Sequence, residues 1–422
     1  MSKTIQEIQD RIDSGRARVY TASEFKELVR SGDAPAVDDV DVVTCGTLGV
    51  MSGTAAIFNI PIAGNRAFSR AASVTINGVP GTIGPCPNES LGLIDCIVNG
   101  TAHRDKDYGG GHLFRDLVAG EAVHVVVTAD DGRVFERDIT LAEIPFARII
   151  IIRGAFKNYH CFTNGWDDEY ETIFSGPIPF KGGYSEATVS GCGEISPLQN
   201  DPNLDYFRPG ARVLVNGAPG MVLGEGTRSS PAKPNLSMQA DMHLMKAEYM
   251  GGFRTSEGPE VLASVAAAIP ITGEEAYNHA AILDEATPMP LADAHDRKVF
   301  RQGAYADVWR GTDWDIEVDL DSCLHCGECR ADRYCPVGAR PSGGIDPSRC
   351  VQCGLCTRTC VGGVFSADLG RVDFGDGHVV PVSVRQSSRL KGERLSSLVK
   401  GEVERGEWRL WNRPGISDSF FN

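Results

Sequence analysis

The sequence predicts an α+β fold, with a large mixed N-terminal domain followed by a small domain that holds two iron–sulfur clusters. Helix-like and strand-like segments alternate irregularly through the first 255 residues, and eight cysteines are then gathered between Cys323 and Cys360. We expect four regions, which are a large mixed domain, a helical or irregular connector, a cluster domain, and a C-terminal hairpin with a helix. Their expected bounds are 1–255, 256–315, 316–370 and 371–422.

The composition is that of a globular protein in a reducing compartment. The 422 residues are 42% hydrophobic and carry a net charge of −15, which argues against a nucleic-acid partner. No apolar run approaches the ~20 residues of a membrane helix, and the polar N-terminus lacks the apolar core of a signal peptide. Thirteen cysteines without an export signal favour the cytoplasm. The oligomeric state stays open.

Hydrophobic patterns and turn residues place the expected elements of the N-terminal domain. Two short helices are expected within 1–32, and a buried strand at Val42-Val43-Thr44 is expected to end in a small-residue turn over 46–53. A strand over 73–79 should close in a Pro-Gly turn. The remaining expected elements are a helix over 112–119, a hairpin of 122–128 and 134–139 around Asp130-Asp131-Gly132, and a strand over 148–152.

The second half of the chain gives weaker signals. The Ala-rich segments 259–270 and 273–285 are expected to be helices, and 286–316 to be irregular. A hairpin is expected over 371–384 and an amphipathic helix over 386–405. We expect this C-terminal part to cover the cluster domain, which has little core of its own.

A weak internal repeat divides the N-terminal domain into two candidate halves. Cys45-Gly46 precedes Asn77-Gly78-Val79-Pro80-Gly81, and Cys192-Gly193 precedes Asn216-Gly217-Ala218-Pro219-Gly220. Each half thus contains a Cys-Gly turn and a strand that ends in Asn-Gly-x-Pro-Gly. Asn-Gly and Pro-Gly are also common turn dipeptides, so a duplication and a coincidence of turns are both open.

The eight cysteines form two consecutive runs with the ligand spacing of a two-cluster bacterial ferredoxin. Two-residue gaps let three thiolates surround one corner of a cluster, and the fourth cysteine of each run usually crosses to the other cluster. One [4Fe–4S] cluster is therefore assigned to Cys323, Cys326, Cys329 and Cys360, and the second to Cys350, Cys353, Cys356 and Cys335. Zinc sites are the alternative, since C-x2-C pairs also bind zinc, and a disulfide framework is disfavoured in a chain of this size.

Three of the five remaining cysteines are candidates for catalysis. Cys45 and Cys192 lie beside glycines in apparent turns, where backbone amides would lower the pKa of an exposed thiol. Cys161 follows His160, which could assist its ionisation. Buried, unreactive cysteine is the alternative for each of them, and it is the expected state of Cys96. Cys86, in a Pro-flanked loop, is a weaker candidate.

Three basic residues are candidate clamps for a substrate carboxylate, because arginine offers a planar fork of donors. They are Arg153, Lys157 and Arg228. Arg228 lies in the Gly-rich loop 224–230, whose amides could hold a carboxylate or phosphate, although a flexible turn is the alternative. Neither a P-loop nor a dinucleotide-binding fingerprint is present.

Residues 40–54 (VDVVTCGTLGVMSGT), the two Asn-Gly-x-Pro-Gly segments and residues 193–202 (GEISPLQNDP) resemble the homocysteine-biosynthesis family. With the cysteine runs, the whole chain is similar to the methanogenesis marker 16 metalloproteins. The resemblance implies an L-aspartate semialdehyde sulfurtransferase type of reaction, in which an aldehyde becomes a CH2–SH group. It also implies that the ferredoxin-like partner of this family is fused to the chain, so that two [4Fe–4S] clusters supply electrons.

The sequence departs from this family at two positions. The resemblance places a cysteine after Met51, where this chain has Ser52. It places a second cysteine after an Arg-Asn pair, where this chain has Lys157-Asn158-Tyr159 and Cys161 two positions later. Cys45 and Cys161 are therefore the candidate replacements.

Three functions are compatible with these patterns. The first is an enzyme that incorporates sulfur into a small aldehyde from a sulfur donor, with a redox partner protein. The second is an electron-transfer or maturation factor without turnover of its own, and the third is a zinc-stabilised structural protein.

Overall fold

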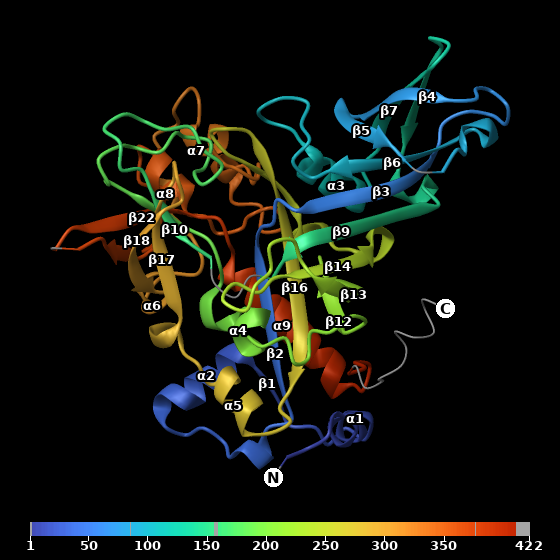
Figure 1. The fold of residues 1–422 in the computed structure, drawn as a ribbon. Helices are drawn as coiled ribbons and strands as arrows, with labels where there is room; N and C mark the ends of the chain where they lie inside the picture. Colours follow the sequence, from blue (N-terminus) through green and yellow to red (C-terminus); the bar gives the residue numbers. More distant parts are fainter. Residues whose placement is uncertain (1, 85, 156–158, 376, 411–422) are drawn as a thin grey trace.

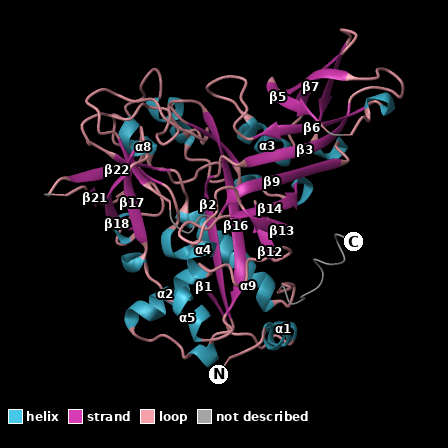
Figure 2. Cartoon of the chain, in the orientation of Figure 1, coloured by secondary structure: helices cyan, strands magenta, loops and turns pink. Residues whose placement is uncertain are grey.

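The computed structural model describes residues 2–84, 86–155, 159–375 and 377–410 and has the predicted α+β class. A long, mostly antiparallel sheet crosses the molecule, and α1, α2 and α5 gather at one end of it (Figure 1). A second sheet and the cysteine-rich region lie to one side, where long loops join short elements (Figure 2). Lys157, one of the three candidate carboxylate clamps, lies outside the described residues.

The large sheet has fourteen strands, and all pairings but one are antiparallel. The exception joins β1 and β2. In spatial order the strands are β1 (Val19–Thr21), β2 (Val42–Val50), β16 (Pro259–Pro270), β12 (Arg212–Val215), β13 (Ala218–Glu225), β14 (Leu236–Asp241), β9 (Phe146–Gly154), β3 (Thr54–Pro61), β6 (Leu93–Asn99), β5 (Val79–Ile83), β4 (Ala71–Ile76), β7 (Val123–Ala129) and β8 (Val134–Ile139), with β15 (Gly251–Arg254) beside β16.

This strand order repeats itself on either side of the central β3–β9 pair. Moving outward from β3, the strands are β6, β5, β4 and β7, and moving outward from β9 they are β14, β13, β12 and β16. The chain follows the same path through the first four strands of each half. It runs from the central strand (β3 or β9) to the fourth strand of that half (β4 or β12). It then returns through the next strand (β5 or β13) to the strand beside the centre (β6 or β14). The sheet therefore has two pseudo-repeated halves, which is one of the two possibilities that the sequence leaves open.

The repeated Asn-Gly dipeptides form equivalent hairpins in the two halves. Asn77 and Asn216 have φ values of 48° and 51°, and the glycine after each has a φ of 78°, as a type I′ turn requires. The amide of each asparagine donates to the next strand, to His124 O in one half and Ser264 O in the other, and its Oδ1 accepts from the same residue. The predicted Pro-Gly turn is wrong, because Pro80-Gly81 lies within β5.

The second sheet is built from three distant parts of the chain. Its strands in order are β18 (Val299–Ala304), β17 (Pro288–Asp293), β10 (Cys161–Thr163), β11 (Ala187–Val189), β22 (Val379–Arg385) and β21 (Arg371–Asp373). The segment 286–316, expected to be irregular, thus contributes two strands, whereas the expected hairpin over 371–384 is present as β21–β22. A pair of short strands, β19 (Glu317–Val318) and β20 (Phe365–Ser366), lies in the cysteine-rich region.

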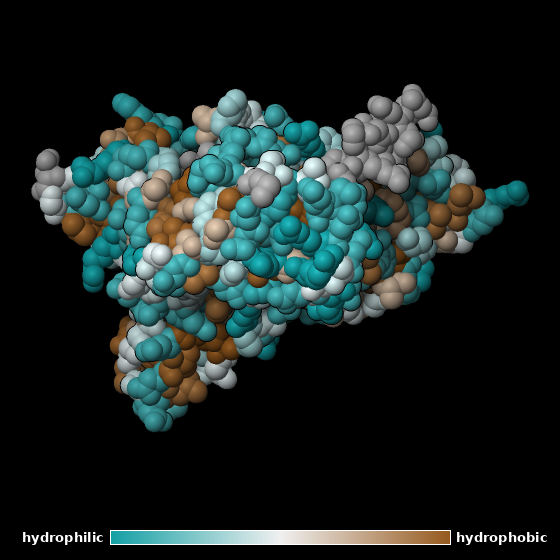
Figure 3. Space-filling view, turned by 90° about the horizontal axis from the view of Figure 1, so that it is seen from below, coloured by the Kyte–Doolittle hydropathy of each residue, from teal (hydrophilic) through white to brown (hydrophobic). Residues whose placement is uncertain are grey.

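The helices are short apart from the last one. Their bounds are α1 (Ile5–Asp13), α2 (Ala22–Ser31), α3 (Gly110–Val118), α4 (Pro197–Asn200), α5 (Glu274–Ala280), α6 (Ala306–Trp309), α7 (Arg330–Arg333), α8 (Leu355–Thr359) and α9 (Arg389–Glu404). None of the described helices is long and apolar enough to cross a membrane. Seen from the end that carries α1, α2 and α5, the surface is mainly hydrophilic (Figure 3), as expected for a chain of net charge −15.

Two predicted elements are wrong for a common physical reason. The segment 259–270 is not a helix but the strand β16, buried along its whole length between β12 and β2. The turn expected over 46–53 is instead the continuation of β2 as far as Val50. Small residues are needed in both strands because α9 lies directly on them. A Cβ atom on Gly46 would approach the Gly392 carbonyl oxygen of α9 to 2.3 Å.

The helix predicted over 386–405 is therefore present as α9, but its expected position over the cluster domain is wrong. It packs on β2 and β16, so the C-terminal region belongs to the core of the large sheet. The predicted boundary at residue 255 likewise falls between β15 and β16, two strands that pair with each other.

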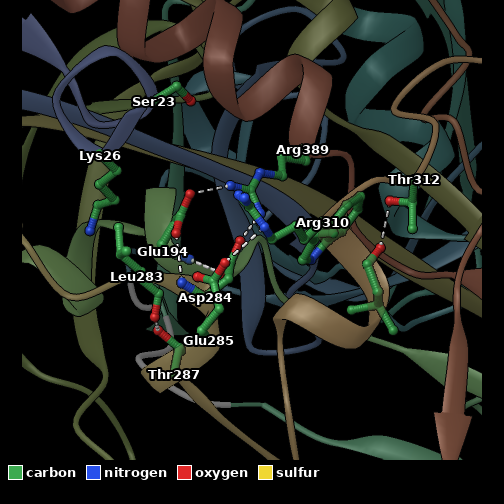
Figure 4. A network of polar contacts seen from close by, with 12 residues as sticks. Ser23, Lys26, Glu194, Leu283, Asp284, Glu285, Thr287, Arg310, Thr312 and Arg389 are labelled. Carbon is green, nitrogen blue, oxygen red and sulfur yellow. Dashed lines mark hydrogen bonds and ion pairs between the residues drawn. The ribbon is translucent and has the colours of Figure 1, made fainter. Parts of the chain in front are cut away.

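A buried ion network fixes the start of α9 to three other segments (Figure 4). The Arg389 guanidinium pairs with Glu194 at 2.9 Å and with Asp284, and Arg30 of α2 also pairs with Glu194. The two carboxylates are joined through the backbone, since each residue's amide donates to the other's side chain, at 2.7 and 2.6 Å. Burial alone would raise the pKa of Glu194, but the Arg389 charge and the Arg30 hydrogen bond hold it below its ordinary value.

Replacing Arg389 should strongly lower the protein's free energy of unfolding. In Arg389→Met, Glu194 and Asp284 lose a partner inside a site where all three side chains are at most 3% exposed, and breaking a buried pair from one side costs about 3–5 kcal/mol. Urea unfolding followed by circular dichroism measures the loss. Arg301→Met, which breaks an exposed pair with Asp373, is the control and should cost less than about 1 kcal/mol. Equal losses in the two variants would contradict a structural role for the network.

Lys26 should make stability depend on pH. Burial lowers the pKa of Lys26 to about 8 from 10.5, even though Glu194 and Asp284 lie nearby. Between these two values the unfolded chain binds more protons than the folded chain, so this residue's contribution to stability rises with pH by about 1.4 kcal/mol per unit. The free energy of unfolding of wild type minus that of Lys26→Met should therefore increase between pH 8 and 10. In the control comparison, the free energy of unfolding of wild type minus that of the exposed Lys106→Met should stay constant over the same pH range.

Candidate functional site

The eight cysteines of the two runs are divided between two cavities in the region 316–370. Cys323, Cys326, Cys329 and Cys360 line a cavity of about 310 Å3. The remaining wall is largely apolar and includes Leu324, which is 66% exposed at the surface. Three of these thiols come from the first run and the fourth comes from the second.

The other four cysteines line the second, smaller cavity, and here three come from the second run. They are Cys335, Cys350, Cys353 and Cys356. Burial raises the pKa of Cys353 strongly, and the charges of its three companion cysteines raise it further. The Ala339 amide donates to Cys335 Sγ at 3.2 Å, a type of contact that tunes cluster potentials.

The residues of both cavities fit the clusters that the spacing predicts. Four cysteine thiolates are the donor set of a [4Fe–4S] cluster, with one thiolate for each iron. The division between the cavities coincides with the two predicted ligand sets, including the exchange of Cys335 and Cys360 between the runs. No three Cys, His, Asp or Glu side chains of the described residues are arranged as they would be around a single metal ion. Cluster binding stays a prediction.

The three candidate catalytic cysteines are all buried, and the turn predicted around Cys45 is wrong. Cys45 lies within β2 rather than in a turn, and its Sγ faces the Ala267 carbonyl oxygen of β16 at 3.5 Å. Cys161 begins β10, in the core of the second sheet beside Val189. Burial raises the pKa of both thiols well above the ordinary value, and the nearby Lys26 charge offsets only part of this effect at Cys45.

Cys192 does lie at a Gly-flanked turn, two residues before the buried Glu194 of the ion network. It is fully buried, and its Sγ lies 3.7 Å from the carbonyl oxygens of Leu48 and Ser388. Burial raises its pKa, although Thr47 and Arg389 oppose this. Their burial separates all three thiols from solvent, and a catalytic role for any of them stays a prediction. Cys96 is buried in β6, as expected, and Cys86 is exposed.

Ser52 and Tyr159, the two positions where the resemblance implies cysteines, both lie near Glu260, at the end of the sheet's central strands where β3 begins and β9 ends. Ser52 is exposed and precedes β3, and Tyr159 follows β9, the antiparallel neighbour of β3. Glu260 of β16 lies beneath them at 6% exposure. Burial raises the pKa of Glu260, and a hydrogen bond from Ser52 offsets part of this effect. We name Ser52, Glu260 and Tyr159 the junction site.

Basic side chains surround the junction site on one side. Arg153, at the end of β9, lies against Gly53, and Arg228 and Arg297 are close enough to lower its pKa together with burial, which is the larger cause. Lys233 Nζ lies 3.2 Å from His160 Nε2. The two candidate clamps that the structure describes, Arg153 and Arg228, are thus brought together from the end of a strand and a loop.

A short hydrogen-bonded path joins the junction site to the second cavity. The Arg385 amide donates to the Cys353 carbonyl oxygen at 2.9 Å, and the Val50 amide donates to the carbonyl oxygen of the next residue, Gln386, at 3.0 Å. Val50 is two residues from Ser52. The cysteines of the second run are therefore connected to the junction site through two hydrogen bonds and a few backbone bonds.

Sequence reasoning missed Glu260 and Arg297. Both lie in segments to which the wrong secondary structure was assigned, 259–270 and 286–316. A signal for Glu260 was present, because it is one carboxylate in an otherwise apolar run, and a buried carboxylate marks candidate sites.

Comparison with known proteins gives relatives of two kinds. An uncharacterized protein of Methanothermobacter thermautotrophicus is 44% identical over 97% of this chain and 95% of its own length. An uncharacterized protein of Methanocaldococcus jannaschii is 39% identical over 93% of this chain and 99% of its own length. These relatives match the chain from end to end.

Two more distant relatives are L-aspartate semialdehyde sulfurtransferases. The one from Methanocaldococcus jannaschii is 29% identical over 76% of this chain, and the one from Methanosarcina acetivorans is 27% identical over 74%. The alignments cover only 64% and 63% of those enzymes. No solved structure matches the chain. The family model described as homocysteine biosynthesis enzyme, sulfur-incorporation, matches residues 17–410, and the chain therefore belongs to this family.

Proposed function

We propose that this protein incorporates sulfur into a small aldehyde at the junction site, with electrons supplied through two [4Fe–4S] clusters held by the two sets of four cysteines. The observation that carries the proposal is the position of Ser52 and Tyr159 near Glu260, beside clustered basic residues and within a short path of Cys353. Membership of the sulfur-incorporation family and the named activity of the two distant relatives support it.

The proposed reaction balances when sulfide and two electrons enter together. Hydrogen sulfide adds to the carbonyl carbon, forming the C–S bond, and the resulting hydroxyl leaves as water to give a thioaldehyde. Two electrons and two protons then reduce the C=S group to CH2–SH. Bound clusters would supply these electrons one at a time, and a redox partner protein would replace them.

The residues of the junction site suit the proton transfers. Glu260, with its raised pKa, keeps its proton to higher pH than an ordinary carboxyl and can donate it to the carbonyl oxygen. Ser52 hydrogen bonds to Glu260 and can orient the carboxyl or relay the proton. The basic side chains on the opposite side can bind an acidic group of the substrate. Because Ser52 stands where the resemblance implies a cysteine, we take sulfur to arrive as hydrosulfide, the oxidation level that the two-electron balance requires.

A second candidate is an electron-transfer or maturation factor of methanogenesis without turnover of its own. One observation favours it: Cys45, Cys161 and Cys192 are buried, and burial raises the pKa of each thiol. An electron-transfer protein needs no reactive thiol outside its cluster ligands. Under this alternative the same two clusters are bound, so only turnover separates the two functions.

Turnover is tested with anaerobically reconstituted protein, sulfide, a low-potential reductant and aldehydes including L-aspartate semialdehyde. Thiol product is expected, and Glu260→Gln should lower kcat by about a hundredfold, because a general acid contributes at least this much. Wild-type activity should fall as pH rises through the raised pKa of Glu260, and the variant should lack this limb. Glu257→Gln, at a nearby exposed position, is the control. Absence of product with reduced, intact clusters would favour the second candidate.

Removing one ligand from each cysteine set should separate the clusters. Wild-type protein should contain about eight iron atoms and as many sulfides, and Cys353→Ser or Cys323→Ser should each lose about half. Electron paramagnetic resonance of the reduced variants should show the signal of the remaining cluster. Cys86→Ser changes an exposed cysteine outside both sets and should leave the iron content unchanged. Colourless protein that contains zinc would contradict cluster binding.

A further inference from the structure

The basic side chains beside the junction site come from two loops and the end of one strand. Arg228 and Lys233 lie between β13 and β14, Arg297 lies between β17 and β18, and Arg153 ends β9. Arg228 and Arg297 both lie close to Arg153 and to Tyr159, and Lys233 contacts His160, the residue after Tyr159. The convergence brings four cationic groups to one place in a chain whose net charge is −15.

Three of these cations, Arg228, Arg297 and Lys233, lack the carboxylate partners that other arginines of the protein have. Arg301 pairs with Asp373 and Arg310 with Glu285, but no ion pair joins Arg228, Arg297 or Lys233 to a carboxylate of the described residues. Arg297 is held instead over the ring of Phe174, with its guanidinium carbon 5.0 Å from the ring centre. This contact fixes the side chain without neutralising its charge.

The backbone at Arg228 and Arg297 adopts a conformation that is costly for residues with a side chain. Arg228 has a φ of 57° and Arg297 a φ of 59°, in the left-handed region that residues with a Cβ atom rarely adopt. The loop that carries Arg228 is fixed to β9, since the Thr227 amide donates to the Ile152 carbonyl oxygen at 2.9 Å. Strained backbone of this kind persists where the surrounding structure holds it, and it is concentrated at ligand-binding sites.

We propose that Arg153, Arg228, Arg297 and Lys233 form a binding subsite for a dianionic group, so that the molecule bound at the junction site carries a phosphate or two carboxylates. Four neighbouring cations repel one another, and a single carboxylate neutralises one of them. A zwitterionic amino acid, which brings its own ammonium group, is less suited still. A dianion satisfies the planar donor forks of at least two arginines at once.

The subsite would make the substrate of this chain more acidic than L-aspartate semialdehyde. It rests on the proposed function only in taking the bound molecule to be the acceptor of sulfur. Binding of the acidic group itself can be measured without turnover, so the two proposals fail separately. Phosphate and dicarboxylate share the required charge, and the two are distinguished by which of them binds more tightly.

The test is calorimetric titration of the full-length, cluster-loaded protein with inorganic phosphate, with succinate and with acetate, at low and at moderate salt. Phosphate or succinate should bind at least tenfold more tightly than acetate, and binding should weaken with salt. Arg228→Gln and Arg297→Gln should each weaken dianion binding about tenfold or more, since a hydrogen bond to a charged group is lost.

Arg66→Gln is the matched control. Arg66 is also exposed, also has a left-handed φ, of 63°, and lies beyond the opposite end of β3 from Ser52. This variant should bind dianions as wild type does. Acetate binding as tightly as phosphate and succinate, or unchanged binding in both arginine variants, would overturn the proposal. Dianion binding without thiol product would support the subsite and contradict sulfur incorporation. Thiol product from L-aspartate semialdehyde without dianion binding would support sulfur incorporation and contradict the subsite.

Discussion

The fold depends on the pairing of Arg389 with two buried carboxylates. Glu194 follows the second sheet, Asp284 follows the long strand β16 and its short helix, and Arg389 opens the helix that covers β2 and β16. None of these segments is near another in the sequence. The guanidinium lies against the rings of Trp309 and Trp314, with centroids 5.7 and 4.7 Å away, so the charges are held in a dry, geometrically fixed setting. Such buried pairs stabilise one relative position of the segments and destabilise others.

This arrangement determines where chemistry can occur. With α9 held on the glycine-containing part of β2, the segment before it runs beside the end of the same strand, and the Cys353 loop is bound to that segment. The cysteine-rich region is thereby attached near the end of the sheet's central strands where Ser52 and Tyr159 lie. The attachment uses backbone hydrogen bonds, which are independent of side-chain identity, so both regions can change in sequence while their relation is kept.

The sequence predicted features that depend on local spacing better than features that depend on contacts between distant segments. Cysteine spacing is a local constraint, and both predicted ligand sets lie together as expected. Asn-Gly turns are local as well, and both form the hairpins of the repeat. Alanine-rich β16 was misassigned because alanine favours helices in isolation, whereas its state here is decided by α9 packing on it. The candidate site was located only in part: Arg153, Arg228 and Ser52 were noted, but Glu260 and Arg297 join them through contacts between residues far apart in the chain.

The repeated half-sheets have a consequence for the origin of the site. Two identical five-strand units that pair through one edge strand form a closed arrangement with two equal ends, as a symmetric homodimer does. Joining the units in one chain frees the ends to diverge. Here the segment from β9 to β12, which contains β10 and β11, is added at one end only, and the loop between β3 and β4 at the other end has no counterpart of it. One end could then acquire loops for binding while the other kept the compact turn of an unspecialised sheet.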